Sequence, residues 1–448
     1  MPDRADADIS TRARSQSPAL ARARELTASD TWDLDRRFPI VMDRASGAHV
    51  LDDTGAEYVD LTSCSGAAPL GAGYPEVIEA IVAELRRSGG ILPGPLSVLR
   101  VDLAGRLAAI FPCAQRSVFF RTGSCATTAA VRLARVHTGR RVVLTSGFHG
   151  WHDWHLQYRP QLALPDRDPD TFDFGYDLAR LDELARSRGD VAAVIFTPEV
   201  SVYPAEYARE LAGIVRRHGA LLVVDEVMTG FRYGWGGYHG AAGISPDLIT
   251  LSKGLANGTA LSCVAGRAEV MRAAERTYLG NTFQRETTPF AAALATLDAM
   301  ETGAPLRRIH AAGQRLMAGL DAIFIETGTG AWVSGSPAMF DMIFEDPARG
   351  TGFCQRMWSL GYLMQYGGRF MPSAAITDDD VDQFLQAARA ARPEAAAASR
   401  PGPHPAGHRD DARYLPAAIA FARENFGATE QSVRRWARLR RGGAGSPS

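Results

Sequence analysis

The chain contains a single lysine, and this residue has the most distinctive chemistry in the sequence. Lysine and arginine together number 49, yet every basic position except Lys253 is an arginine. An arginine guanidinium keeps its proton, whereas a lysine amine can lose its proton and form a Schiff base with a carbonyl group. A surface lysine kept by chance is the alternative, but we expect that Lys253 is retained because arginine cannot replace its amine.

Asp225 is the second residue whose position points to chemistry. It ends the apolar run 220–225, which predicts a buried strand, and Lys253 ends a later apolar run, 248–252. Ligands of parallel sheets bind at the C-terminal ends of the strands, so we expect both side chains at one edge. An amine and a carboxylate there suit pyridoxal 5′-phosphate (PLP), because a carboxylate keeps its pyridine nitrogen protonated. Considered by itself, Asp225 could equally cap the next turn.

A short turn of small residues could hold the phosphate group of such a cofactor. Thr122, Gly123 and Ser124 lie between a predicted strand, 117–121, and a predicted helix, 126–137. The N-terminus of a helix presents free N–H groups and the positive end of the helix dipole, and both attract phosphate. An ordinary capped helix is the alternative, and the turn matches neither of the common nucleotide-binding glycine motifs.

Aromatic residues and histidines follow another predicted strand, 141–145. Phe148 could stack its flat ring on a heteroaromatic cofactor. His149, His152 and His155 recur at a spacing of three residues, which could suit a metal ion. Because no further ligand is apparent nearby, we expect no metal in this segment.

The elements that must position these residues alternate along the middle of the chain. Apolar strands separated by helices predict an α/β fold, with a large domain whose mostly parallel sheet is covered by helices. Residues 305–390 mix helices with short strands, as in a smaller α+β domain. The expected organisation is a disordered tail at 1–24, a segment at 25–62 that packs with the small domain, the large domain at 63–300, the small C-terminal domain at 301–392, a linker at 393–412 and a helical extension at 413–448.

The composition is that of an ordinary soluble globular protein. Apolar residues make up 46% of the chain and charged residues 22%, and the formal net charge is −1. Such a charge gives no long-range attraction for nucleic acid, and no apolar run is long enough to span a membrane. The N-terminus lacks the apolar segment of a signal peptide, and the five cysteines form no CxxC pair. We therefore expect a cytoplasmic protein with reduced thiols.

These segments together resemble the class III (ω-) aminotransferases of PLP fold type I, and most of all the branch that includes glutamate-1-semialdehyde aminomutase. The most specific parts are 225–232, with the sequence DEVMTGFR, and 252–258, with the sequence SKGLANG. The segments 47–60 and 280–283 also match. The resemblance implies a PLP-dependent aminotransferase that transfers an amino group to a ketone or aldehyde small molecule, as in a biosynthetic pathway.

The family pattern implies a role for each matching residue around the cofactor ring. Lys253 would form the internal aldimine with PLP and later move the proton between Cα and C4′. Asp225 would pair with the pyridinium nitrogen. Val227 would pack on one face of the ring, and Phe148 would stack on the other.

The same pattern implies how the phosphate group is held. Gly123 and Ser124 would contact it, and so would Thr282 donated by a partner subunit. The active site therefore implies a homodimer, in keeping with the prevalence of twofold oligomers. Small-molecule amino donors and acceptors are the implied substrates.

Several positions depart from the family pattern. Residues 124–126 read Ser-Cys-Ala where Thr-Glu-Ala is usual, and Phe148 replaces a common tyrosine. These departures argue against glutamate 1-semialdehyde as the substrate. An aminomutase, an epimerase or a carbon–carbon bond-forming enzyme is an alternative, because all begin from the same PLP chemistry. A non-catalytic protein of the same fold is a third reading, and the lysine at the aldimine position argues against it.

Overall fold

The computed structural model describes residues 17–27, 40–94, 96–155, 168–280, 282–391 and 412–439. The chain divides into two compact units, and each is built from more than one stretch of sequence. The large unit comprises residues 66–68, 75–306 and 418–448, and the small unit comprises residues 1–65, 69–74 and 307–417. Within the described part of the chain, no helix is both long enough and apolar enough to cross a membrane.

A seven-stranded sheet forms the centre of the large unit. Its strands lie in the order β4-β10-β9-β8-β7-β5-β6. Neighbouring strands from β9 to β6 run parallel, whereas β10 is antiparallel to both of its neighbours. The mostly parallel sheet predicted from the sequence is therefore confirmed, with one reversed strand. The strands are Arg116–Phe120 (β4), Val142–Ser146 (β5), Thr171–Asp173 (β6), Val191–Phe196 (β7), Leu221–Asp225 (β8), Leu248–Leu251 (β9) and Ser262–Gly266 (β10).

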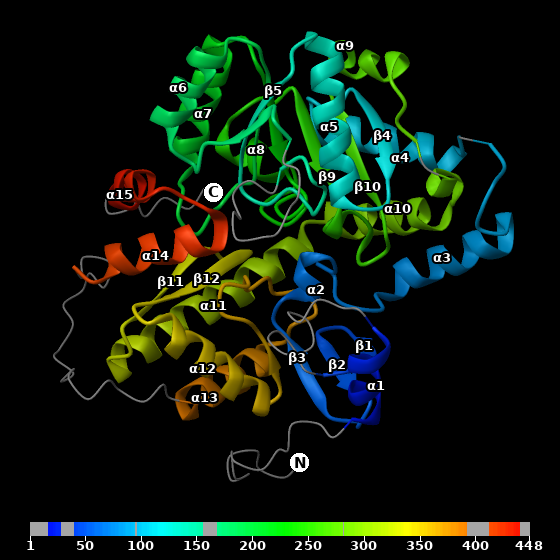
Figure 1. Cartoon of the computed structure of the whole chain (residues 1–448). Coiled ribbons are helices and arrows are strands. Elements are labelled where there is room, and N and C mark those ends of the chain that lie inside the picture. Colours follow the sequence, from blue (N-terminus) through cyan, green and yellow to red (C-terminus); the bar gives the residue numbers. More distant parts are fainter. Residues whose placement is uncertain are drawn as a thin grey trace. The chain divides into compact units, whose positions relative to one another are not determined.

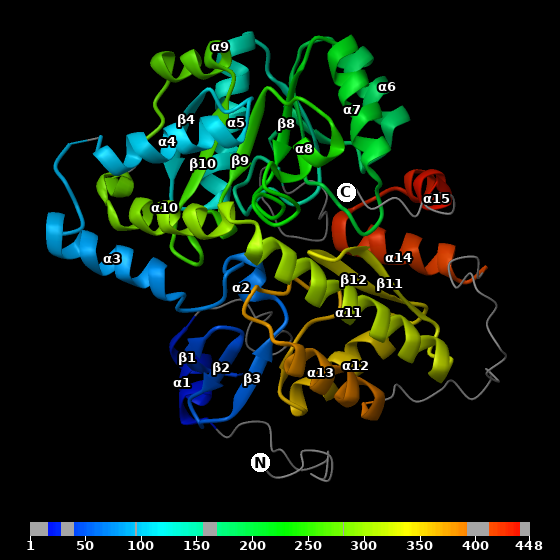
Figure 2. The same cartoon turned by 180° about the vertical axis from the view of Figure 1, so that it is seen from behind.

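Helices cover this sheet, and its inner strands are accordingly apolar on both faces. Strands β5, β7 and β9 are buried along their whole length, as expected for parallel strands between helical layers. Figure 1 shows α5 in front of the sheet, and Figure 2 shows α4 and α10 on the opposite side. The helices are Pro75–Ser88 (α3), Val98–Ile110 (α4), Gly123–Thr138 (α5), Leu178–Arg188 (α6), Ala205–Arg217 (α7), Gly237–Ala242 (α8), Ala268–Met271 (α9), Thr288–Glu301 (α10) and Glu430–Leu439 (α15), with 3₁₀ turns at Lys253–Ala256 (η4), Arg272–Arg276 (η5) and Thr282–Arg285 (η6).

The small unit joins the N-terminal segment to the C-terminal part of the chain. One sheet has the order β1-β2-β3-β13, and β11 and β12 form a separate antiparallel pair. A cluster of phenylalanines, including Phe324, Phe340 and Phe384, lies in its core. Its strands are Met42–Ser46 (β1), His49–Asp52 (β2), Glu57–Asp60 (β3), Ala331–Ser336 (β11), Met339–Phe344 (β12) and Tyr362–Leu363 (β13). The other helices of the chain are Pro18–Leu26 (α1), Ser63–Gly66 (α2), Ala304–Thr327 (α11), Pro347–Ser359 (α12), Asp378–Ala390 (α13) and Tyr414–Phe426 (α14).

The last residues of the expected disordered tail, 1–24, are helical instead, because helix α1 spans Pro18–Leu26. Helix α1 begins at Pro18, and the side chain of Ser17 accepts a hydrogen bond from the N–H of Leu20 at 3.0 Å. The Ser17 hydroxyl also bonds to Asp53. A serine cap followed by proline is a strong helix start, which composition alone does not reveal. Residues 1–16 lie outside the described residues, and so do residues 393–411, which are most of the expected linker at 393–412.

Lys253 has an unusual backbone conformation. It begins the η4 turn, which Ser252 separates from β9. Its φ is +45°, in the left-handed region that residues with a Cβ rarely adopt. The turn is held by the hydroxyl of Ser252, which donates to the carbonyl of Leu261 over 2.9 Å. A left-handed residue other than glycine costs about 1–2 kcal/mol. The surrounding turn therefore imposes a strained conformation on the sole lysine.

We predict that removing the Lys253 side chain has different effects on stability in two variants. Lys253→Ala keeps the Cβ that opposes a left-handed conformation, whereas Lys253→Gly relieves it. Without added cofactor, the free energy of unfolding of the glycine variant should exceed that of the alanine variant by about 1 kcal/mol in guanidinium titrations. Equal stability, or a more stable alanine variant, would contradict the strain assigned to this turn.

Glu226 anchors the segment that follows β8. Its carboxylate is fully buried and accepts hydrogen bonds from the backbone N–H groups of Tyr238 at 3.0 Å and His239 at 2.8 Å. The hydroxyl of Thr229 and Nδ1 of His239, the latter at 2.8 Å, complete the set. Four donors satisfy a carboxylate that burial would otherwise destabilise. The chain after Asp225 is therefore fixed by its own buried anion.

His239 should make stability depend on pH. Burial opposes its charge, but hydrogen bonds with Cys113 and Glu226 and the charge of Glu226 outweigh burial and raise its pKa from 6.5 to about 9. The stabilisation is therefore fully present below pH 6.5 and is lost as the pH rises through about 9. We predict that His239→Gln lowers the free energy of unfolding in urea more at acidic than at alkaline pH. An equal loss at both would refute this.

Candidate active site

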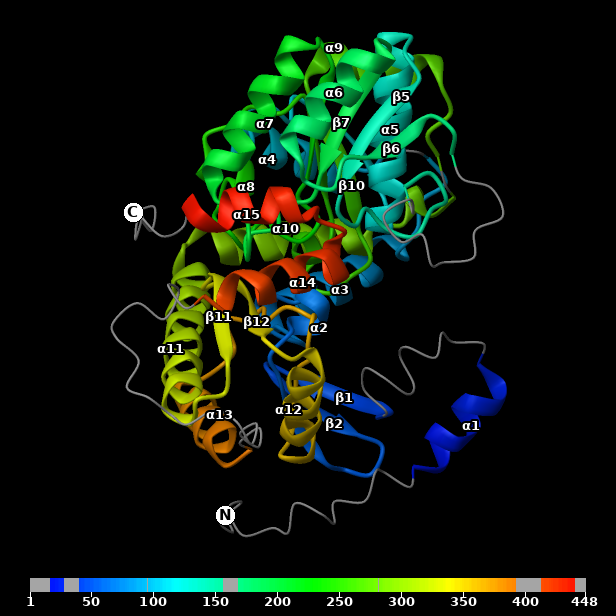
Figure 3. The same ribbon diagram turned by 60° about the vertical axis from the view of Figure 1, so that its left-hand side comes forward.

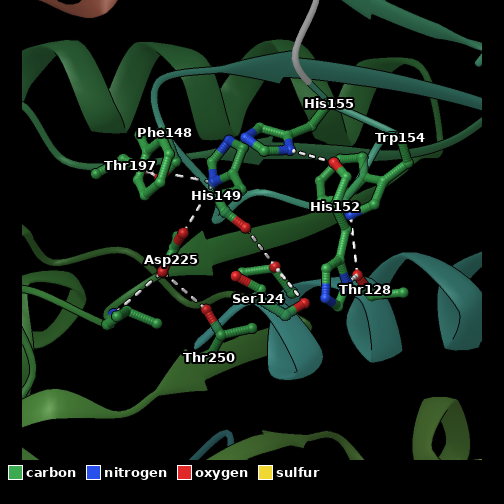
Figure 4. A network of polar contacts seen from close by, with 12 residues as sticks. Ser124, Thr128, Phe148, His149, His152, Trp154, His155, Thr197, Asp225 and Thr250 are labelled. Atoms are coloured by element: carbon green, nitrogen blue, oxygen red, sulfur yellow. Dashed lines mark hydrogen bonds and ion pairs between the residues drawn. The ribbon is translucent and has the colours of Figure 1, made fainter. Parts of the chain in front are cut away.

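Asp225 presents a buried carboxylate at the C-terminal end of β8. The residue is 2% exposed. Its Oδ1 accepts hydrogen bonds from the hydroxyl of Thr250 at 2.9 Å and from the backbone N–H of Val227 at 3.1 Å. Nδ1 of His149 donates to Oδ2 over 2.8 Å, as Figure 4 shows. These donors compensate for the desolvation of the carboxylate and hold its negative charge in one orientation.

His149 is a site residue whose partner the sequence did not reveal. It lies after β5, is 1% exposed and stacks on Trp154 with ring centroids 5.9 Å apart. Thr197 Oγ1 lies 3.3 Å from its Nδ1, and its buried Nε2 has no hydrogen-bond partner among the described residues. Sequence reasoning considered His149 only as a metal ligand. The available signal was that β5 and β8 were both predicted strands of one parallel sheet, so their ends share an edge.

His152 and His155 each have a hydrogen-bond partner other than Asp225. Nδ1 of His152 lies 2.7 Å from the hydroxyl of Thr128, and Nδ1 of His155 lies 3.1 Å from the carbonyl of His152. Burial, with repulsion from His149, lowers the pKa of His155 to about 3, so its ring is neutral near pH 7. In the described residues, no group of three or more His, Cys, Asp or Glu side chains could hold a metal ion.

The N-terminus of helix α5 lies at the same edge of the sheet. Thr122 caps the helix, because its side chain accepts a hydrogen bond from the N–H of Cys125 at 3.3 Å. The N–H groups of Gly123 and Ser124 belong to the first turn, where no carbonyl of the helix can accept them. The hydroxyl of Ser124 accepts a hydrogen bond from the N–H of Trp151 at 3.2 Å. This turn offers donors to an anion.

Close backbone approach brings three predicted site residues together. A Cβ on Gly150 would lie 2.1 Å from Oγ of Ser124, so only glycine fits there. A Cβ on Gly123 would lie 3.0 Å from Cγ1 of Val227, which shows that the Val227 side chain lies over the start of α5. Gly123, Ser124 and Val227 therefore lie side by side. Val227 is also only two residues after Asp225 in the chain.

Phe148 lies beside this group on the loop after β5. The residue is 53% exposed, and its ring meets the edge of the His155 ring at a centroid distance of 5.9 Å. Its carbonyl accepts a hydrogen bond from the hydroxyl of Thr197 at 2.9 Å. The loop is therefore fixed by its backbone, while the Phe148 ring keeps an accessible face.

Lys253 follows the strand adjacent to that of Asp225. In the parallel ladder of β8 and β9, Asp225 pairs with Thr250, and Lys253 comes three positions later. The lysine is half-buried. The structure therefore places the predicted amine and carboxylate at the ends of two neighbouring parallel strands.

Thr282 lies on a separate turn, η6. It is exposed at the start of η6, and the guanidinium of Arg121 tethers this turn through the carbonyl of Phe283 and an ion pair with Glu286 at 3.3 Å. No hydrogen bond of Thr282 to Asp225 or Ser124 is present in the described residues. Its assignment to the site of a partner subunit stays a prediction.

The donor set at this edge fits PLP. A carboxylate held by three donors suits a pyridinium nitrogen, and a helix N-terminus suits a phosphate group. The amine of Lys253 on the adjacent strand suits an aldehyde. The glycine at position 150 leaves a cradle beside Ser124 that a Cβ would fill.

Comparison with known proteins agrees with this chemistry. The family model for class III aminotransferases matches residues 33–391. The chain is 39% identical to 2′-deamino-2′-hydroxyneamine transaminase of Streptomyces kanamyceticus over 381 residues, which cover 82% of this chain and 95% of that protein. It is 33% identical to glutamate-1-semialdehyde 2,1-aminomutase of Methanothrix thermoacetophila over 349 residues, which cover 73% of this chain and 81% of that protein.

A solved structure shares the fold. The PLP internal aldimine form of the FumI protein from Sphingopyxis sp. MTA144 is 29% identical, with a TM-score of 0.76 over 83% of this chain and 94% of that chain. The fold, the sequence match and the site therefore lead to the same family. This chain belongs to the class III aminotransferases and is a PLP-dependent enzyme.

Proposed function

We propose that this aminotransferase, with PLP held by Lys253, transfers an amino group to a ketone or aldehyde of a small molecule in a biosynthetic pathway. The observation that carries the proposal is the arrangement at the ends of β8 and β9, where the sole lysine lies next to the strand of Asp225. Bound PLP supplies an electron sink, and the protein supplies binding, orientation and proton transfer.

Three side chains have roles in the reaction. Asp225 keeps the ring nitrogen of the cofactor protonated, and His149 holds the Asp225 carboxylate in place through its hydrogen bond at 2.8 Å. Lys253 would hold the cofactor through its aldehyde group. Its amine, when free, would move a proton between Cα of the substrate and C4′ of the cofactor.

Other residues bind the cofactor without moving protons. Gly123 and Ser124 bind the phosphate group through the first turn of α5, where the dipole favours an anion. Val227 and Phe148 pack against opposite faces of the ring. The contact between Gly123 and Val227 and the exposed face of Phe148 support these roles.

The substrate class is proposed from one relative. The Streptomyces protein named as 2′-deamino-2′-hydroxyneamine transaminase shares 39% identity over nearly its full length. We propose that this chain likewise aminates a carbonyl carbon on a polyhydroxylated molecule of the aminoglycoside type. Such a molecule carries hydroxyl groups that a polar cavity recognises by hydrogen bonds, and a site built for them rejects analogues that lack them.

An aminomutase is a second candidate, because an aminomutase is 33% identical over 81% of its length. The two functions differ in their products. A mutase moves the amino group from one carbon to another of the same molecule, so PLP is regenerated without a second substrate. An aminotransferase leaves the amino group on the cofactor after the first half-reaction. The departures at residues 124–126 and at Phe148 argue against glutamate 1-semialdehyde as the substrate of such a mutase.

We propose that the enzyme is a cytoplasmic homodimer in which Thr282 of one subunit contributes to the site of the other. Exposed large apolar side chains, Tyr278 and Phe283, flank Thr282 in the sequence and support a covered surface there. All five cysteines are free, as suits a reducing compartment.

We predict that the protein bound to PLP converts the cofactor to pyridoxamine phosphate when mixed with an amino donor. Absorbance spectroscopy across a panel of amino acids and amines checks this, with Lys253→Arg as the control that cannot form the covalent link. Borohydride reduction should attach the pyridoxyl group to Lys253 alone, as shown by peptide mapping. If no donor converts the cofactor but solvent deuterium enters Cα of a substrate, the mutase or epimerase reading replaces this one.

Asp225→Asn should lower the rate of the half-reaction about 10²–10³-fold, because an amide carries no charge to keep the ring nitrogen protonated. His149→Gln should lower the rate less, since the carboxylate remains. The matched control is Asp190→Asn, an exposed position directly before β7 at the opposite edge of the sheet. Stopped-flow absorbance gives the rates, and a loss no greater than in the control would remove Asp225 from its proposed role.

A further inference from the structure

The C-terminal helix α15 lies beyond residues 33–391, which the family model matches, and yet it docks on the large unit. We propose that Thr429 and Ser432, at the start of α15, position the cofactor site, acting through Tyr176 and Thr197 on the loop that carries Phe148 and His149. This inference rests on the proposed function, because it assigns PLP to the site at Asp225.

The first link joins α15 to the turn before α6. The hydroxyl of Ser432 donates to the carbonyl of Tyr176 at 2.6 Å and lies 3.1 Å from the hydroxyl of Tyr203. The N–H of Thr429 donates to the carbonyl of Gly175 over 2.9 Å. Ser432 is buried, so these bonds are made away from water. The start of α15 therefore fixes the backbone of residues 175 and 176.

Side chains of α7 also contact α15. The ring of Trp436 meets the edge of the Tyr207 ring at a centroid distance of 5.3 Å. Arg435 forms an ion pair with Glu210 at 2.7 Å. Figures 1 and 3 show α15 near α7. Trp436 and Arg435 therefore attach α15 to α7, whereas Ser432 contacts Tyr176. Substitutions can test the two sets of contacts separately.

The second link is the Tyr176 side chain. Tyr176 has φ at +58° and is fully buried, with its ring stacked on that of Tyr203 at a centroid distance of 4.8 Å. Its hydroxyl donates to the carbonyl of Thr197 at 2.9 Å. A Cβ on Gly147 would lie 2.3 Å from that hydroxyl, so Tyr176 also packs directly on the residue before Phe148.

The third link reaches the site. The hydroxyl of Thr197 donates to the carbonyl of Phe148 at 2.9 Å and lies 3.3 Å from Nδ1 of His149. That nitrogen donates to Asp225. Ser432, Tyr176, Thr197 and His149 are buried. Tyr176 also holds a backbone conformation that needs support from its surroundings. Loosening Ser432 therefore shifts the loop that orients the Asp225 carboxylate.

The test compares two variants in the chain of contacts with one on the same helix outside it. Ser432→Ala and Tyr176→Phe each remove one hydroxyl, while Arg434→Ala removes an exposed side chain whose ion pair, within the described part of the chain, is with Glu430 of α15. We expect the first two to weaken PLP binding roughly 3- to 10-fold, the worth of one hydrogen bond, and the third to leave it unchanged. The double variant should bind no more weakly than either single variant, because both interrupt one series of contacts that leads to the site.

A second readout separates positioning from general destabilisation. The pH midpoint of the absorbance change of bound PLP should rise in Ser432→Ala and Tyr176→Phe. A less well held Asp225 leaves less positive charge on the ring nitrogen, so the protonated nitrogen at the Lys253 link keeps its proton to higher pH. A fall in melting temperature alone would not move this midpoint.

The outcomes are distinct. If both variants match Arg434→Ala in PLP affinity and in pH midpoint, the inference is overturned, and α15 serves only to cover apolar surface. If Ser432→Ala does not fold, Tyr176→Phe decides in the same way. Failure of the unchanged protein to bind PLP would overturn the proposed function itself, which the wild-type titration shows before any variant is compared.

Discussion

A buried negative charge at the edge of the large sheet governs the architecture of this site. A histidine, a threonine hydroxyl and a backbone N–H all point at the two oxygens of Asp225 and compensate for the burial of its carboxylate. Each donor comes from a different strand end or loop, so those segments must be held in register with β8. The loop after β5, in which His149 stacks on Trp154, places Nδ1 of His149 within hydrogen-bonding distance of that carboxylate.

The residues with unusual chemistry could be found from the sequence, whereas their supporting contacts could not. Lys253 was conspicuous as the only lysine, and Asp225 as the only acid in a long apolar run. The parallel sheet then placed both at one edge. The bond between His149 and Asp225 joins residues 76 positions apart, and no local pattern reports such a pair.

The same limit explains the C-terminal part of the chain. Helical periodicity marks the extension as helical, but the contact of Ser432 with Tyr176 spans 256 positions and depends on the exact docking of α15. Helix α1 was overlooked for a different reason. Its composition resembles a disordered tail, and the decisive signal is a single serine before a proline. Local capping chemistry outweighed average composition there.

The solitary lysine has a practical consequence for following the state of the enzyme. A protease that cleaves only after lysine can cut the denatured chain at one peptide bond, between Lys253 and Gly254, and so produces two large fragments. Any lasting modification of the ε-amino group blocks that cut. Gel electrophoresis of a digest would then show at a glance what fraction of the molecules carried a modified side chain, with no background from other sites.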